Sequence, residues 1–129
     1  MIFKIILIGL GGGAGSILRY LTSVFLEKHF QSVFPIATFA VNFAGCLLTG
    51  LLLGFLEQQQ IMNNNLKFLF ITGFCGGYTT FSAFAAENMN LFQSENSTTA
   101  FIYILSSIFV CLAAVWAGFI ISQFIFKIR

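Results

Sequence analysis

The sequence predicts an all-α integral membrane protein with four transmembrane helices. Of its 129 residues, 58% are hydrophobic and only 8% are charged, and the mean hydropathy is +0.94. A soluble domain carries roughly 25% charged residues, so this chain could not cover a water-facing surface. Four apolar stretches reach the length of about 20 residues that a helix needs to cross the hydrocarbon core. A net charge of +2 without a basic cluster argues against a nucleic-acid partner.

We expect the chain, 1–129, to form a single membrane domain with helices at approximately 2–26, 35–56, 68–86 and 100–126. The connections between them are short and polar, and no linker marks a second domain. The N-terminal stretch MIFKIILIGLGGGAGS resembles a signal peptide. Its apolar pattern continues to Phe25, however, so we interpret it as the first span. Pro35 suits the first turn of the second helix, where its missing N–H is not needed.

An even number of spans places both termini on one side of the membrane. That side would carry most of the basic residues, namely Lys4, Lys67, Lys127 and Arg129. Lys28 and Arg19 would lie toward the other side. The positive-inside rule therefore favours cytoplasmic termini, by about two charges.

Small residues recur at the four-residue spacing that lets membrane helices approach closely. They are Gly11 and Gly15, Gly50 and Gly54, and Ala114 and Gly118. We interpret them as packing faces within a bundle or a dimer and not as binding sites.

The second span carries polar and small residues on one helical face: Thr38, Asn42, Gly45 and Thr49. The amide of Asn42 has two N–H donors, which could point at an anion or clamp a neighbouring helix. For an isolated Asn in a membrane helix, the clamp is the commoner role.

In the fourth span Tyr103, Ser107 and Cys111 form a stripe at spacings of four residues. The hydroxyls of Tyr103 and Ser107 could replace the hydration shell of a small ion, or could bond back to carbonyls of their own helix. Arg19, near the end of the first span, could snorkel to the headgroups. Alternatively, it could create a positive potential at the mouth of an anion path.

The acidic residues Glu27, Glu57, Glu87 and Glu95 fall at the ends of spans or in connections. A proton-coupled exporter of this size would hold a carboxylate within the membrane. Residues 5–18 of the first span contain no charge, which argues against a small multidrug exporter. His29 lies in a connection and the three cysteines are scattered, so the sequence offers neither a catalytic set nor a metal cluster and predicts no enzyme.

The segment GGYTTFSAF, 76–84, is unusual for a membrane helix because every backbone polar group in lipid needs a partner. The pair Gly76–Gly77 predicts a break in the third helix. Carbonyls freed at a break are good ligands for a small cation, and Thr79, Thr80 and Ser82 could satisfy the rest. Phe81 and Phe84 would share a helix face, where the positive edges of their rings could hold a dehydrated anion. They could equally be two core phenylalanines among eighteen.

The stretch GFCGGYTTFSAFAAE, 73–87, closely resembles the third-helix motif of the Fluc (CrcB) fluoride-channel family. GGGAGSILRY at 11–20 and FPIATFAVNFAGCLLTG at 34–50 resemble its first and second spans. The similarity covers essentially the whole chain, including its length and four-span layout.

The resemblance implies a fluoride-selective passive channel that exports cytoplasmic fluoride and gives fluoride resistance. It also implies an antiparallel, dual-topology homodimer in the inner membrane of a bacterium or similar microbe, with a structural sodium ion at the dimer interface. By matching positions, the carbonyls of Gly76 and Thr79 would bind the sodium. The implied fluoride pore comprises Asn42, Phe81, Phe84, Ser82, Thr38, Tyr103, Ser107, Arg19 and Glu87.

This chain departs from the family pattern at three positions. Ala83 and Ala85 replace residues that commonly carry hydroxyls, and Cys111 stands where a Ser is expected. A hydroxyl lost beside the pore could slow conduction. The small charge bias is compatible with insertion in both orientations. The remaining alternatives are a small dual-topology multidrug exporter and a non-transporting membrane assembly subunit.

Overall fold

The computed structural model describes residues 1–58 and 64–126, which are almost entirely helical. In chain order the elements are α1 (Ile2–His29), α2 (Ile36–Gln58), α3 (Asn64–Leu66), η1 (Lys67–Cys75), α4 (Gly76–Tyr78), α5 (Phe81–Gln93) and α6 (Ser97–Phe126). Four segments of the described chain are long and apolar enough to cross a membrane: α1, α2, Lys67–Gln93 and α6. The predicted all-α protein with four apolar helices is therefore confirmed.

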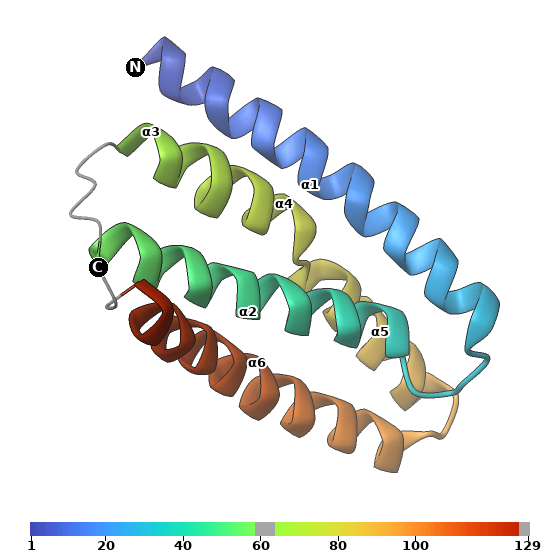
Figure 1. Cartoon of the computed structure of the whole chain (residues 1–129). Helices are drawn as coiled ribbons and strands as arrows, with labels where there is room; N and C mark the ends of the chain where they lie inside the picture. Colours follow the sequence, from blue (N-terminus) through green and yellow to red (C-terminus); the bar gives the residue numbers. More distant parts are fainter. Residues whose placement is uncertain (59–63, 127–129) are drawn as a thin grey trace.

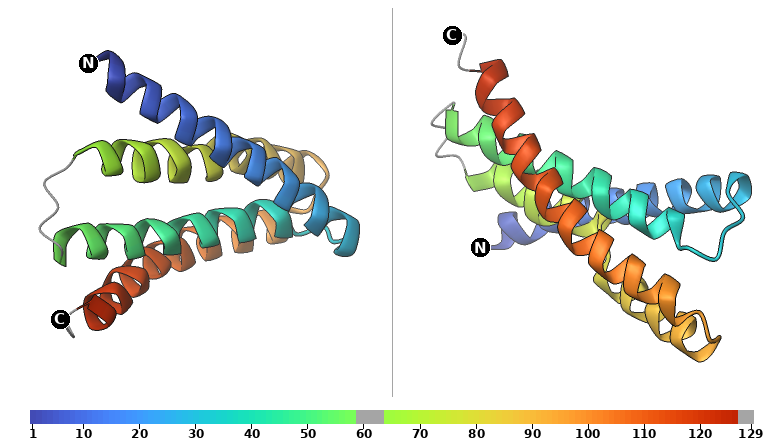
Figure 2. Two further views of the ribbon diagram at one scale, coloured as in Figure 1. Left: turned by 45° about the horizontal axis from the view of Figure 1, so that its top comes forward. Right: turned by 90° about the horizontal axis from the view of Figure 1, so that it is seen from below.

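The four long segments alternate in direction, so that α2 and α6 run parallel to each other and α1 runs opposite to both (Figures 1 and 2). The start of α1 lies at the same end of the molecule as the end of α6. Lys4 lies at this end with its ammonium nitrogen 5.1 Å from the centre of the Phe68 ring. The basic residues Lys127 and Arg129 and the connecting residues 59–63 lie outside the described residues.

The first span packs on the third through bare backbone. A Cβ added at Gly11 would lie 2.1 Å from the carbonyl oxygen of Leu69, and one at Gly15 would lie 2.2 Å from that of Phe74. A Cβ at Gly77 would meet the Gly12 carbonyl oxygen at 2.4 Å. The glycines of the first span thus form the packing face that the sequence predicts, because no side chain fits between the two helices.

The helices α2 and α6 form the most extensive helix pair of the described chain. An added Cβ at Gly50 would lie 2.0 Å from the Val115 carbonyl oxygen, and one at Gly118 would lie 2.3 Å from that of Leu47. Further along, Gln58 Nε2 donates to Gln123 Oε1 at 2.9 Å. Parallel α2 and α6 therefore pair residues that are 65 positions apart in the sequence.

The backbone conformation changes twice along the third segment, Lys67–Gln93. Lys67–Cys75 is a π-helix, which the sequence pattern does not predict. Gly76 is helical, and α4 continues to Tyr78. The extended residues are instead Thr79 (φ −79°, ψ 160°) and Thr80 (φ −150°, ψ 124°), which separate α4 from α5. The helix beyond them ends at Gln93 and not near residue 86, so Glu87 lies well inside α5.

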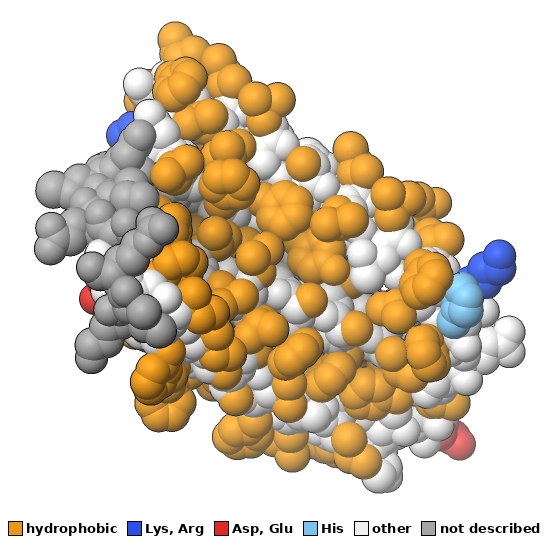
Figure 3. Space-filling view, in the orientation of Figure 1, with side chains coloured by type: hydrophobic (Ala, Val, Ile, Leu, Met, Phe, Trp, Pro, Cys, Tyr) orange, Lys and Arg blue, Asp and Glu red, His pale blue; other side chains and the backbone are white. Residues whose placement is uncertain are grey.

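Hydrophobic side chains cover most of the face shown in Figure 3, and charged side chains appear only near its two ends. This distribution matches a chain whose middle is surrounded by lipid or by another apolar surface.

We predict that Gly50→Ala destabilises the protein and that Gly9→Ala does not. The new methyl at position 50 would overlap the α6 backbone, at a cost of about 1–3 kcal/mol. At position 9 an added Cβ meets nothing within 4 Å. There the higher helix propensity of Ala should keep or raise the stability. Thermal unfolding in detergent measures both variants, and an unchanged midpoint for Gly50→Ala would contradict the packing described.

Candidate functional site

A groove of about 400 Å³ lies between α2, the start of α5 and α6. Its lining includes four residues of the predicted pore, Asn42, Phe81, Phe84 and Ser107, together with Cys111. Asn42 and Ser107 are 65 positions apart, so the register of α2 against α6 brings them to the same level. None of the described residues that line this groove carries a charge.

Asn42 clamps the extended backbone that precedes α5. Its Nδ2 donates to the Thr80 carbonyl oxygen at 3.0 Å, and its Oδ1 accepts from the Thr80 N–H at 2.7 Å. Thr80 in turn caps α5, because its Oγ1 accepts from the Ala83 N–H at 3.2 Å. The clamp is thus present, and since Nδ2 carries two hydrogens, the bond to Thr80 uses only one of its donors.

Ser107 is 7% exposed, and its hydroxyl has no hydrogen-bond partner among the described residues. Its neighbour Ser106 instead donates to the Tyr103 carbonyl oxygen at 3.3 Å, and Thr49 donates to that of Gly45 at 2.8 Å. Bonding back to the helix therefore occurs at Ser106 and Thr49 but is not seen at Ser107. A buried hydroxyl without a partner costs about 1–3 kcal/mol, so a polar group that enters the groove would find a free hydroxyl at this position.

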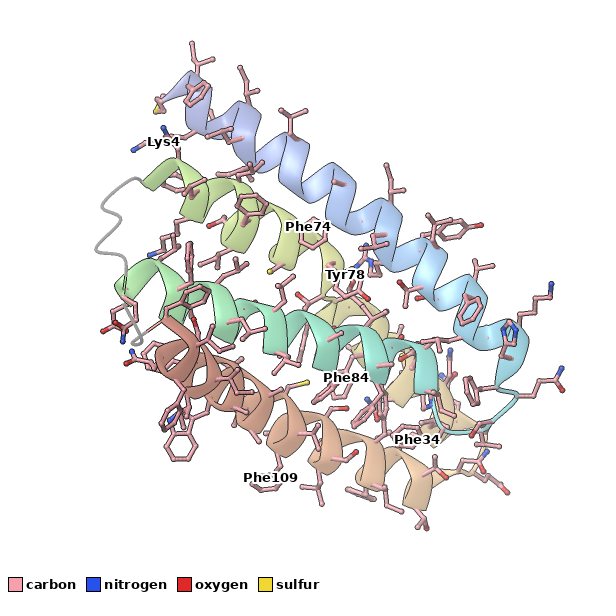
Figure 4. The ribbon with its side chains drawn as sticks, in the orientation of Figure 1. Lys4, Phe34, Phe74, Tyr78, Phe84 and Phe109 are labelled. Atoms are coloured by element: carbon pink, nitrogen blue, oxygen red, sulfur yellow. The ribbon has the colours of Figure 1, made fainter. Side chains whose placement is uncertain are left out.

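Three aromatic rings form a chain along the groove. The ring centres of Phe81 and Phe84 are 5.5 Å apart at an interplanar angle of 42°, and those of Phe84 and Tyr103 are 5.0 Å apart at 58°. Phe84 lies beside the α2–α6 pair and packs against the cluster around Tyr103 (Figure 4). Phe81 is 79% exposed. The two phenylalanines therefore differ, since Phe84 is packed against other rings and Phe81 projects from the surface of the chain.

Glu87 joins two of the predicted residues. Thr38 Oγ1 donates to Glu87 Oε1 at 2.6 Å, and the Tyr103 hydroxyl donates to Glu87 Oε2 at 2.7 Å. The family resemblance assigned all three residues to the pore, but the spacing of residues in the sequence gave no sign of their contact. Thr38 and Tyr103 are also 65 positions apart, however, and this shared offset is the signal that could have revealed the cluster.

Arg19 lies at a second hollow of about 490 Å³, on the side of α5 that faces α1. Thr38, Ser82 and Glu87 also line this hollow. Arg19 Nη1 donates to the Thr79 carbonyl oxygen at 3.3 Å, and Ser82 Oγ is hydrogen-bonded to Thr80 Oγ1 at 3.2 Å. Eight of the nine predicted pore residues are thus divided between two hollows, whereas Tyr103 is fully buried and lines neither; Thr80 lines both.

The two carbonyls expected to bind sodium lie in different surroundings. The Thr79 carbonyl accepts from Arg19, whereas Gly76 is exposed and an added Cβ there would meet only the Ile71 carbonyl oxygen, at 3.8 Å. No group of three or more His, Cys, Asp or Glu residues in the described chain could hold a metal ion.

Comparison with known proteins identifies the family. The model of the CrcB-like protein family, described as Camphor Resistance (CrcB), matches residues 6–119. A fluoride-specific ion channel FluC of Flavobacterium psychrophilum is 55% identical over 90% of this chain and 94% of its own length. A FluC of Azobacteroides pseudotrichonymphae is 45% identical over 96% of this chain and 99% of its own, and FluC 2 of Rhodococcus jostii is 41% identical over 89% and 95%. The chain therefore belongs to the CrcB family.

Proposed function

We propose that this protein is a fluoride-selective passive ion channel of a bacterial or similar inner membrane. The observation that carries the proposal is the uncharged groove where the Asn42 amide, the unpartnered Ser107 hydroxyl and the Phe81–Phe84 pair meet. Similarity to proteins named fluoride-specific ion channels supports the choice of ion.

Neutral donors suit passive conduction of a small anion. A hydroxyl and an amide N–H can replace part of the anion's hydration shell without the strong binding that a cation would impose. The ring edges of Phe81 and Phe84 carry partial positive charge. They would stabilise the anion in the part of the path that has no hydrogen-bond donors. Fluoride is smaller than chloride, so a narrow path lined in this way favours it.

The second hollow would serve as the entrance. Arg19 would raise the local concentration of anions there. Glu87 would repel them, but both of its oxygens accept bonds from the hydroxyls of Thr38 and Tyr103, so its role in this proposal is to orient those hydroxyls. Thr80 lines both hollows and would mark the passage between them.

A second copy in the opposite orientation would complete the path. Phe81 and Gly76 are exposed, as are many large apolar side chains of the described residues. We propose that the antiparallel partner covers this surface and that the extended Thr79–Thr80 pair is the family's broken third helix.

Backbone oxygens near this pair fit a structural sodium ion. The exposed Gly76 has open space beside it, and the Thr79 carbonyl keeps a second lone pair while it accepts from Arg19. We propose that Gly76 and Thr79 of both copies hold the sodium, which would supply positive charge between the two extended segments.

The channel would remove fluoride without a metabolic energy source. Neutral HF crosses membranes and dissociates in a more alkaline cytoplasm, where fluoride is trapped. A negative-inside membrane potential drives the anion out through an open path. A non-transporting assembly subunit would leave the unpartnered Ser107 hydroxyl unexplained.

Fluoride efflux from liposomes that contain the purified protein tests the function. We expect rapid loss of fluoride while matched liposomes retain chloride, as measured with ion-selective electrodes. Retention of fluoride by a correctly folded protein would refute the proposal.

We predict that Phe81→Ile reduces fluoride efflux to the background of empty liposomes without unfolding the protein. Isoleucine is apolar but lacks the positive ring edge, and the exposed side chain contributes little to folding. Phe124, also exposed and outside the groove, provides the matched control Phe124→Ile, which should conduct normally. Equal efflux from both variants would remove Phe81 from the path.

We predict that Ser107→Ala slows fluoride efflux and does not lower stability. The substitution removes a donor from the groove and also removes a buried hydroxyl that has no partner. In Ser106→Ala, the lost hydroxyl is one that bonds only to its own helix, so efflux should stay normal. Efflux and thermal unfolding are measured on both, and a Ser107→Ala protein that conducts normally would contradict the assigned role.

A further inference from the structure

Two of the three cysteines meet in the groove. Cys46 of α2 and Cys111 of α6 both line it, and each lies one helical turn before the residues Gly50 and Val115, where the two helices meet. They are 65 positions apart, so they pair by the same register that places Asn42 beside Ser107. Each is partly exposed, and a solute in the groove would reach both.

The third cysteine differs from this pair in its surroundings. Cys75 is 3% exposed and is not part of the groove lining. The proposed conduction path uses the thiol of none of the three. A second feature marks the groove as a place for a ligand, because the buried, unpartnered hydroxyl of Ser107 lies one helical turn before Cys111.

We propose that Cys46 and Cys111 form a two-thiol binding site for a soft divalent cation that prefers two ligands in a line, such as the mercuric ion. Thiolates select soft metal ions. In the described chain no group of three or more His, Cys, Asp or Glu residues could hold a metal, so the pair has no third thiolate, imidazole or carboxylate beside it. Ions that need four ligands, such as zinc, are therefore poorly served.

Charge balance decides between monovalent and divalent ions. The reaction is M²⁺ + 2 RSH → RS–M–SR + 2 H⁺, in which two S–H bonds break, two metal–sulfur bonds form and both protons leave to water. The product is neutral. A monovalent ion with the same two thiolates would leave a net negative charge in an apolar groove, which is costly.

Binding there would block the anion path, a consequence that rests on the proposed function. The ion would bridge α2 and α6 one turn beyond Asn42 and Ser107, inside the same groove. Because the complex is neutral, the block would be steric and would follow occupancy of the site.

A thiol count on the purified full-length protein tests the site without any transport measurement. Mercuric nitrate is added at one ion per chain, a monothiol wash removes singly bound ions, and the remaining free thiols are alkylated and counted by mass spectrometry. We expect the native protein to lose two of its three free thiols. The Cys75→Ser variant should still lose two free thiols. In Cys46→Ser and Cys111→Ser the wash should remove the ion, so that all remaining thiols are again free.

Fluoride efflux under the same additions tests the block. We expect mercuric ion to stop efflux in the native protein and in Cys75→Ser, and a dithiol to restore it. Cys46→Ser and Cys111→Ser should need at least about tenfold more mercuric ion, because a singly held ion lacks the gain of a second, tethered ligand.

Three outcomes are distinct. If Cys46→Ser kept the mercuric ion through the wash, or if Cys75→Ser lost it, the proposed two-thiol site would be wrong. Uptake by two thiols with unchanged efflux would overturn the block. Absence of efflux before any metal is added would refute the channel function, and the thiol count would still decide the site.

Discussion

The backbone contact between α2 and α6 is the constraint on which the rest of the structure depends. Gly50 and Gly118 let the two helices touch without an intervening side chain, and this contact fixes a constant offset of 65 residues between them. One turn away the same offset pairs Cys46 with Cys111, and further turns pair Asn42 with Ser107 and Thr38 with Tyr103. The polar groups of two helices therefore converge because two glycines, which themselves bind nothing, set the register.

A second constraint keeps the backbone of Thr79 and Thr80 extended within the third segment. Extended backbone within a membrane is tolerated only where its polar groups find partners. Asn42 satisfies both the N–H and the carbonyl of Thr80, Arg19 donates to the Thr79 carbonyl, and the Thr80 hydroxyl caps α5. These residues thus act first as structural partners of the backbone, and any ion that passes would meet groups whose positions are already fixed.

The sequence predicts the four apolar helices and the glycine packing faces, because period, length and small-residue spacing are local properties. It also selects Asn42, Phe84 and Ser107, which the structure brings into one groove. It does not predict the π-helix, or that Thr79 and Thr80 rather than Gly76 and Gly77 are the extended residues. Both depend on contacts with other helices: Gly77 packs on Gly12, and Asn42 holds Thr80. The hydrogen bonds of Thr38 and Tyr103 to Glu87 are missed for the same reason, since the three residues lie on three helices.

The contact between α2 and α6 has an open half, which borders the groove, and a closed half. The boundary between them lies at Gly50. On one side of Gly50 the helices part enough to leave the groove, and on the other they are closed by backbone contact and by the pairing of Gln58 with Gln123. Val115 lines the groove and is also the residue whose carbonyl opposes Gly50. The groove therefore ends at the level of this backbone contact. The groove shares Thr80 with the hollow at Arg19, so a conducting path, as proposed, would turn around the extended segment and not follow a helix axis.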